Sequence, residues 1–230
     1  MSILDSENED YWIPLADIMT GLMLIFLLIA VSYMLKVHQE EAKLQQQYAR
    51  SNAIVLNNLV VKKQLYNSLK AEFSDDLEDW QASIESQDLA IRFNAPGVLF
   101  DTGAANLKPA FTQILDDFFP RYLSLLQDPQ YESSIAAIHI DGYTSSIWSD
   151  NTEQSQAYFL NMQLSQQRTM SVLKYLYYMN TDATIQQYLR DHFTANGLAS
   201  SHLIFNEDGS ENPLKSQRVE FKILLKGTNE

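Results

Sequence analysis

Cysteine is absent from this chain of 230 residues. Disulfide scaffolds, thiolate metal sites and cysteine nucleophiles are therefore excluded. Basic residues are also few, because 16 Lys and Arg stand against 29 Asp and Glu, for a formal net charge of −13. So acidic a chain is a poor match for an extended phosphate-binding surface, and we expect no nucleic-acid partner.

Common enzyme motifs are missing as well. The sequence has no phosphate-binding loop and no Gly-x-Ser-x-Gly elbow. Its 4 histidines, His38, His139, His192 and His202, have no metal-ligand spacing. We expect a protein that is not an enzyme and that holds neither a metal nor a cofactor.

A long apolar run lies near the amino terminus. No charged residue occurs from Ile18 to Leu35, and Asp17 directly precedes this run. A helix over 13–35 would extend about 35 Å, enough to cross a hydrocarbon core of roughly 30 Å. The leader over 1–10 is acidic and has no Lys or Arg, which argues against a cleaved signal peptide. We predict a tail over 1–10 and a transmembrane helix over 11–36.

Asp17 is costly within such a helix. A carboxylate in the bilayer costs about 2.5–3.5 kcal/mol on insertion scales, so it is tolerated mainly where it meets protein or water. Thr20 and Gly21 lie on the same helix face and would offer a hydroxyl and a close-packing surface. The alternative is that Asp17 lies at the membrane interface and the span begins at Ile18.

The rest of the chain predicts a stalk followed by a domain. Residues 37–87 are polar with apolar positions mostly three or four apart, which predicts a helical stalk. Its apolar positions pack either on the stalk's own domain or on a second copy of the chain. Residues 88–230 predict an α+β domain, a mixed sheet with helices packed on one face. The predicted strands are Leu89–Phe93, Val98–Phe100, Ile135–Tyr143, Leu203–Phe205 and Arg218–Leu225, and the predicted helices cover 108–126, 156–178 and 183–194.

Two parts of the sequence resemble known families. The segment Tyr11–Thr20 resembles the membrane signature of ion-driven motor subunits such as the flagellar stator MotB, in which an aspartate precedes a Met-Thr pair. The carboxyl-terminal part resembles OmpA-like peptidoglycan-binding domains at 98–103, 140–144, 161–168 and 216–220. The most specific of these matches is Asn-x-x-Leu-Ser-x-x-Arg at 161–168.

The combination resembles the B subunits of Zorya anti-phage defence systems. This resemblance implies a proton-driven motor in the bacterial inner membrane, with a dimer of this chain inside a pentamer of a ZorA-like multi-span subunit. It implies a cytoplasmic amino terminus and a periplasmic carboxyl-terminal domain. The positive-inside rule disagrees, because Lys36, Lys43 and Arg50 follow the span and no basic residue precedes it. A passive peptidoglycan-binding tether and a flagellar-type stator subunit are the alternatives.

The resemblance also implies roles for single residues. Asp17 would carry the ion, with Thr20 beside the hydrated path. In the OmpA-like domain, Arg168 would bind the carboxylate of the diaminopimelate side chain of peptidoglycan. Asn161, Leu164, Thr144 and Ser145 would line the same pocket.

Ser145 stands where the OmpA-like family has an aspartate for the diaminopimelate amine, and Asp150, in the insertion that follows, is a candidate to replace it. The alternatives are that Arg168 is a solvated helix residue, Asn161 a helix cap and Arg218 an edge-strand charge.

Overall fold

The computed structural model describes residues 12–149 and 151–227. The chain divides into two compact units, one ending at Ile54 and the other beginning at Val55. The predicted tail over 1–10, Tyr11 and Asp150 lie outside the described residues.

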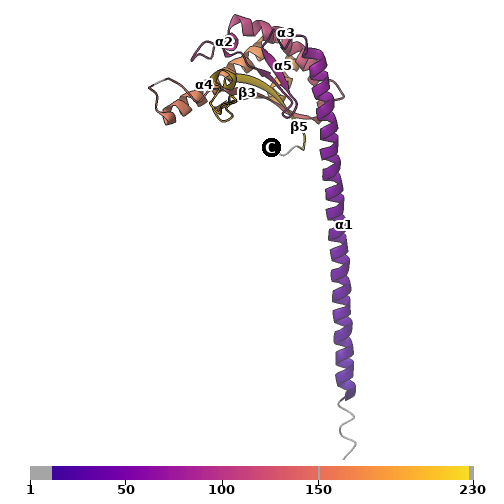
Figure 1. Cartoon of the computed structure of the whole chain (residues 1–230). Coiled ribbons are helices and arrows are strands. Elements are labelled where there is room, and N and C mark those ends of the chain that lie inside the picture. The colour runs from indigo at the N-terminus through magenta and orange to yellow at the C-terminus, as the bar shows by residue number, and fades with distance from the viewer. Residues whose placement is uncertain (1–11, 150, 228–230) are drawn as a thin grey trace, which may run out of the picture. The chain divides into compact units, whose positions relative to one another are not determined.

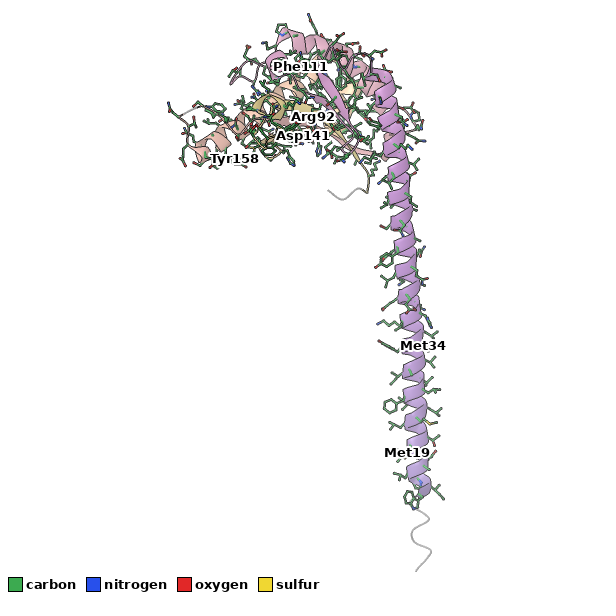
Figure 2. All side chains as sticks on the ribbon, in the orientation of Figure 1. Met19, Met34, Arg92, Phe111, Asp141 and Tyr158 are labelled. Atoms are coloured by element: carbon green, nitrogen blue, oxygen red, sulfur yellow. The ribbon has the colours of Figure 1, made fainter. Side chains whose placement is uncertain are left out.

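The first unit contains the apolar part of helix α1, whose bounds are Trp12–Phe73. Within the described ranges, only α1 is long and apolar enough to cross a membrane. Its large apolar side chains between Trp12 and Leu35 are all at least 48% exposed. Met19 and Met34, for example, project from the ribbon (Figure 2). The first unit by itself leaves this apolar surface uncovered, as expected of a helix that lipid or another protein surrounds.

The second unit is built on a five-stranded sheet with the strand order β1-β2-β5-β3-β4. Its strands are β1 (Ala82–Glu85), β2 (Ala90–Phe93), β3 (Ile135–Tyr143), β4 (Phe193–Ala199) and β5 (Arg218–Leu225). β3 and β4 pair in parallel and the other neighbours pair antiparallel, so the sheet is mixed, as predicted. The last strand, β5, lies at the centre of the sheet.

Helices follow the strands in an α+β order. They are α2 (Pro96–Leu99), α3 (Pro109–Leu126), the 3-10 helix η1 (Glu132–Ser134), α4 (Gln154–Met179), α5 (Ala183–His192) and α6 (Pro213–Ser216). α2, α3 and α6 each have a proline in the first turn, where the missing N–H is not needed. α3, α4 and α5 lie against the sheet (Figure 1).

The core lies between these helices and one face of the sheet. On β5, Val219, Phe221 and Ile223 alternate with polar residues and are at most 4% exposed. The ring of Phe221 lies 5.1 Å from that of Phe118 in α3 and 6.0 Å from that of Phe93 in β2, both edge to face. Such aromatic pairs bury large apolar areas in a preferred geometry and fix how the layers meet.

The last turns of α1 belong to this core. Val61, Leu65, Leu69 and Phe73 are spaced four apart on one helix face and are all buried. The stalk therefore packs on its own domain over these turns, which is one of the two predicted alternatives. The compact unit begins at Val55, ahead of the predicted boundary at residue 88, because both these turns and β1 belong to it. The other alternative, in which stalk residues nearer the amino terminus pack against a second copy of the chain, stays a prediction.

Two predicted strands are wrong. Val98 falls in helix α2, because Pro96 begins a helical turn in which the amides of Val98 and Leu99 donate to the carbonyl of Ala95 at 2.8 and 3.0 Å. Leu203–Phe205 is not a strand, because β4 occurs earlier in the chain and fills the edge beside β3. Phe205 forms only an isolated bridge. The predicted helical stalk over 37–87 is wrong in its last part, because α1 ends at Phe73 and β1 occupies Ala82–Glu85. The remaining predicted strands and helices are confirmed, and β3 and β5 have the predicted bounds.

Candidate ligand-binding site

Helix α4 is fixed to β4 by side-chain hydrogen bonds. The amide of Gly197 donates to Gln166 Oε1 at 2.8 Å, and Gln166 Nε2 donates to the carbonyl of Ala195 at 3.0 Å. The amide of Ala199 donates to Ser165 Oγ at 3.1 Å. These bonds set the position of α4 along the strand, and with it the side chains that α4 presents at its amino-terminal half.

The close approach of α4 to β4 requires glycine at position 197. A Cβ there would lie 2.4 Å from the backbone nitrogen of Gln166. We expect Gly197→Ala to lower the free energy of unfolding by about 1–3 kcal/mol, because either the helix or the strand must shift. Urea unfolding of the full chain in detergent, followed by circular dichroism, measures this loss. Gly97→Ala is the matched control, since nothing lies within 4 Å of its added Cβ. Equal midpoints for the two variants would contradict the prediction.

A cavity of about 430 Å³ lies at the carboxyl end of β3, beside α4. Its walls contain all five residues predicted for peptidoglycan binding, namely Thr144, Ser145, Asn161, Leu164 and Arg168. The remaining lining residues are Thr102, Gly103, Ile147, Trp148, Pro213 and Gln217. These six come from turns, the loop after β3, and α6 with the residue that follows it. Periodicity does not mark such positions, and these six were not predicted as site residues. The roles of the five predicted residues stay predictions.

Arg168 is the one cation among the described residues that line this cavity. Arg168 is 5% exposed, so it is not a solvated helix residue. Its Nε donates to the carbonyl of Ala104 at 2.9 Å and its Nη2 to that of Asp101 at 3.2 Å, and the guanidinium lies 4.8 Å from the ring centre of Phe100. Burial lowers the pKa of Arg168 to about 10, so the side chain is charged at neutral pH. Among the described residues no carboxylate pairs with it.

Two further polar atoms of the cavity wall lack partners. Asn161 Nδ2 and Thr144 Oγ1 are buried and accept or donate no hydrogen bond within the described part of the chain. Asn161 lies well inside α4, which begins at Gln154, so it is not a cap. A buried polar group without a partner costs about 1–3 kcal/mol. Together with the unpaired Arg168, these atoms provide ready contacts for a polar ligand.

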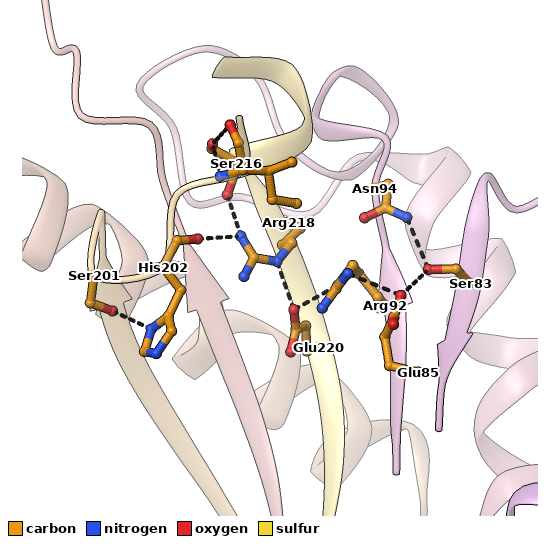
Figure 3. Close-up of polar contacts among 10 residues, drawn as sticks. Ser83, Glu85, Arg92, Asn94, Ser201, His202, Ser216, Arg218 and Glu220 are labelled. Atoms are coloured by element: carbon orange, nitrogen blue, oxygen red, sulfur yellow. Dashed lines mark hydrogen bonds and ion pairs between the residues drawn. The ribbon is translucent and has the colours of Figure 1, made fainter. Parts of the chain in front are cut away.

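A buried ion network lies beside the cavity and holds the segment that supplies Pro213 and Gln217. Arg218 Nη1 donates to the carbonyls of Ser216 and His202 at 3.0 and 3.1 Å (Figure 3). Glu220 Oε1 accepts from Arg218 Nε at 2.6 Å and from Arg92 Nε at 2.7 Å. Arg218 therefore lies on the central strand and fixes the chain ahead of it; it is not an edge-strand charge.

Asp141 lies next to this network, paired across the strands with Glu220. Burial raises the pKa of Asp141, and Glu220 raises it further, while the hydrogen bond from Asn196 and the charges of His139 and Lys222 lower it. A raised carboxyl pKa in the folded state means that ionised Asp141 opposes folding.

We therefore expect Asp141→Asn to increase the free energy of unfolding at pH 7, because the amide keeps an acceptor for Asn196 and carries no charge. The gain should disappear as the pH falls below the ordinary carboxyl range, where Asp141 is neutral in both states. Urea unfolding at pH 3 and pH 7 measures the difference. A variant that is less stable than the parent chain at pH 7 would show that the charge of Asp141 stabilises the fold.

Asp17 and Thr20 lie far along the sequence from the cavity, on the exposed part of α1. The hydroxyl of Thr20 donates to the carbonyl of Ala16 at 2.7 Å. Asp17 has no hydrogen bond or ion pair to the described residues. The predicted roles of Asp17 as ion carrier and of Thr20 beside the hydrated path depend on a partner protein, and they stay predictions.

Comparison with known families identifies the class of the second unit. Residues 99–221 match the OmpA family, which is more than half of the chain. The sheet order, the α4 motif and the cavity thus belong to an OmpA-family protein with an apolar amino-terminal helix.

One curated relative covers almost the whole chain. The Zorya protein ZorB of Escherichia coli strain Crooks is 43% identical over 220 residues, which are 96% of this chain and 89% of the relative. The chain therefore belongs to the ZorB family. Family membership and the apolar helix support a stator-like, single-pass protein of the inner membrane.

Solved structures with similar folds include a MotB-like protein from Desulfovibrio vulgaris. It is 22% identical, with a TM-score of 0.49, and the match covers 72% of this chain and 94% of that one. The cell wall anchor of the T6SS from Pseudomonas aeruginosa is 18% identical, with a TM-score of 0.45, over 69% of this chain and 97% of that one.

Proposed function

We propose that this chain is the ion-conducting stator subunit of a Zorya anti-phage motor, anchored to peptidoglycan by the cavity beside α4. The membrane part would carry protons on Asp17, and the OmpA-family domain would hold the motor to the wall. The observation that carries the proposal is the buried Arg168, which has no carboxylate partner among the described residues and stands beside two unpartnered polar atoms.

The anchoring step follows from the chemistry of the cavity. A guanidinium forms short, strong hydrogen bonds with a carboxylate, and two of the Arg168 nitrogens are already oriented by backbone carbonyls. The diaminopimelate side chain of a peptidoglycan stem peptide supplies such a carboxylate. Asn161 and Thr144 would bind its polar atoms, and Leu164 would contact its methylene chain.

The ion-carrying step follows from the position of Asp17 in an apolar helix. A carboxyl group whose surroundings open alternately to the two sides of the membrane can load a proton on one side and release it on the other. The change in charge would favour one packing of the helices of a ZorA-like partner over another and so drive rotation. Two copies of this chain would lie within five copies of the partner, with Thr20 near the hydrated path.

Wall anchoring determines the orientation that we propose. Peptidoglycan lies outside the inner membrane, so the carboxyl-terminal domain would be periplasmic and the amino terminus cytoplasmic. The three basic residues after the span, Lys36, Lys43 and Arg50, oppose this orientation. Reporter fusions at the two ends of the full chain decide between the two orientations.

Sedimentation with purified peptidoglycan sacculi tests the proposed function. We expect the full chain, expressed with a ZorA-like multi-span partner and extracted in detergent, to sediment with sacculi and to bring the partner with it. A chain that sediments without the partner would be a passive tether. A chain that stays in the supernatant would refute anchoring.

A further inference from the structure

The connection between β4 and β5, residues 200–217, passes the carboxyl end of β3. β3 lies between β4 and β5 in the sheet, and Arg218, the first residue of β5, pairs with Tyr143, the last of β3. The connection therefore crosses the edge of the sheet at which the cavity lies, and its residues Pro213 and Gln217 line that cavity. Where the connection lies thus determines the shape of this part of the wall.

Little apolar packing holds the β4–β5 connection. Ser216 is its only buried residue, and the structure describes all of residues 200–217. Phe205 and Leu214, by contrast, are 59% and 68% exposed. A segment that lacks a core of its own keeps one conformation only where hydrogen bonds fix it.

Arg218 fixes the carboxyl end of the connection. It donates to the backbone carbonyls of Ser216 and His202, and its own guanidinium is held by Glu220 at 2.6 Å (Figure 3). Ser216 Oγ in turn accepts from the backbone amide of Ile204 at 2.9 Å. One buried side chain on the central strand therefore orders both arms of the connection.

Glu211 fixes the connection to a second segment of the cavity wall. Its carboxylate accepts from the backbone nitrogen of Ser146 at 3.0 Å and from the Ser146 hydroxyl. Ser146 lies between Ser145 and Ile147, which both line the cavity. Glu211 therefore joins the connection to the loop after β3.

We infer that Arg218 and Glu211 are positioning residues of the cavity. They hold the connection and the loop after β3 in the arrangement that the ligand requires, although neither is among the residues that line the cavity. Without either hold, the ligand would have to order the wall as it binds, and that cost lowers the affinity. This inference rests on the proposed wall anchoring and adds two residues on which binding depends.

Calorimetric titration of the full chain in detergent with a synthetic stem tripeptide that contains diaminopimelate tests the inference. We expect Glu211→Ala to weaken binding about two- to tenfold, the cost of ordering one or a few side chains. Glu211→Gln should recover most of the affinity, because its side-chain oxygen still accepts from Ser146. Arg218→Lys should weaken binding at least as much as Glu211→Ala, since a single nitrogen cannot replace the planar set of donors.

Glu207→Ala is the matched control. It removes the same charge from an exposed position of the same connection, and Glu207 has no hydrogen bond or ion pair to the residues that the structure describes. It should bind the peptide as the parent chain does.

Hydrogen exchange separates positioning from general stability. In Glu211→Ala and in Arg218→Lys, the backbone amides of Ile204 and Asn212 should exchange faster than in the parent chain, while those of β5 should exchange as before. Saturating peptide should slow the exchange of both amides again. Loss of protection throughout β5 would show a purely structural role.

The outcomes for the peptide distinguish the inference from the proposed function. Parent-like affinity in both Glu211→Ala and Arg218→Lys would overturn the positioning roles and leave anchoring intact. Equal losses in Glu211→Ala and Glu211→Gln would show that the charge of Glu211 acts on the ligand, which also overturns its positioning role. If Arg218→Lys fails to fold, the two Glu211 variants decide. A folded parent chain that binds no peptide would refute anchoring and the positioning roles with it.

Discussion

Asp17→Asn is expected to abolish proton flux through the assembled complex. Asparagine is close in size to aspartate but binds no proton near neutral pH, so the carrier is lost while the helix surface is retained. Flux is measured with a pH-sensitive dye in vesicles that contain the full chain and its ZorA-like partner. The variant should fall to the level of empty vesicles.

The same variant should assemble with the partner and sediment with sacculi as the parent chain does, since the cavity is untouched. Glu41→Gln is the matched control, because it also removes an acidic charge from an exposed position on α1 and should leave flux unchanged. Normal proton flux in vesicles that contain the Asp17→Asn variant would refute the ion-carrying role. The passive peptidoglycan-binding tether would then be the remaining function.

Arg168→Ala is expected to weaken peptidoglycan binding by about 2–5 kcal/mol, or roughly 30- to 4000-fold in Kd. The variant removes the only cation of the described cavity wall and leaves a ligand carboxylate buried without a partner. Calorimetric titration with a synthetic stem tripeptide that contains diaminopimelate, together with sedimentation on sacculi, measures the loss.

Two further variants test whether the charge of Arg168 or the shape of its guanidinium matters, and whether the loss is specific to this position. Arg168→Lys keeps the charge but loses the planar donor fork, so it should recover only part of the affinity. Arg190→Ala removes a basic residue from an exposed position on α5 and should bind as the parent chain does. If Arg168→Ala binds normally while its unfolding midpoint falls, the arginine serves only to hold the carbonyls of Asp101 and Ala104.

The location of the cavity was predictable to a useful degree from sequence. Asn161, Leu164 and Arg168 follow the spacing of one helix face, and Thr144 and Ser145 follow directly after a strand whose alternation is clear. Local patterns of this kind are strong because they depend on the geometry of a single element. These patterns place the residues on a helix and at a strand end; only the family resemblance predicted that they line one pocket.

Contacts between distant segments were not predictable in the same way. Pro213 and Gln217 reach the cavity because Arg218 holds the chain ahead of β5 through carbonyl groups, which the sequence does not mark. β4 was missed because Thr194, Ala195, Asn196 and Gly197 have neither high strand propensity nor apolar alternation. Its strand state depends on parallel pairing with β3 and on the hydrogen bonds to Ser165 and Gln166.

The buried turns at the end of α1 have a mechanical consequence. Leu65, Leu69 and Phe73 are at once part of that helix and fully enclosed by the domain. A load on this end of the helix must shear many packed side chains together, whereas a flexible tether would first extend and take up slack. The attachment is therefore stiff, and the globular body has to deform before the helix end can come away from it.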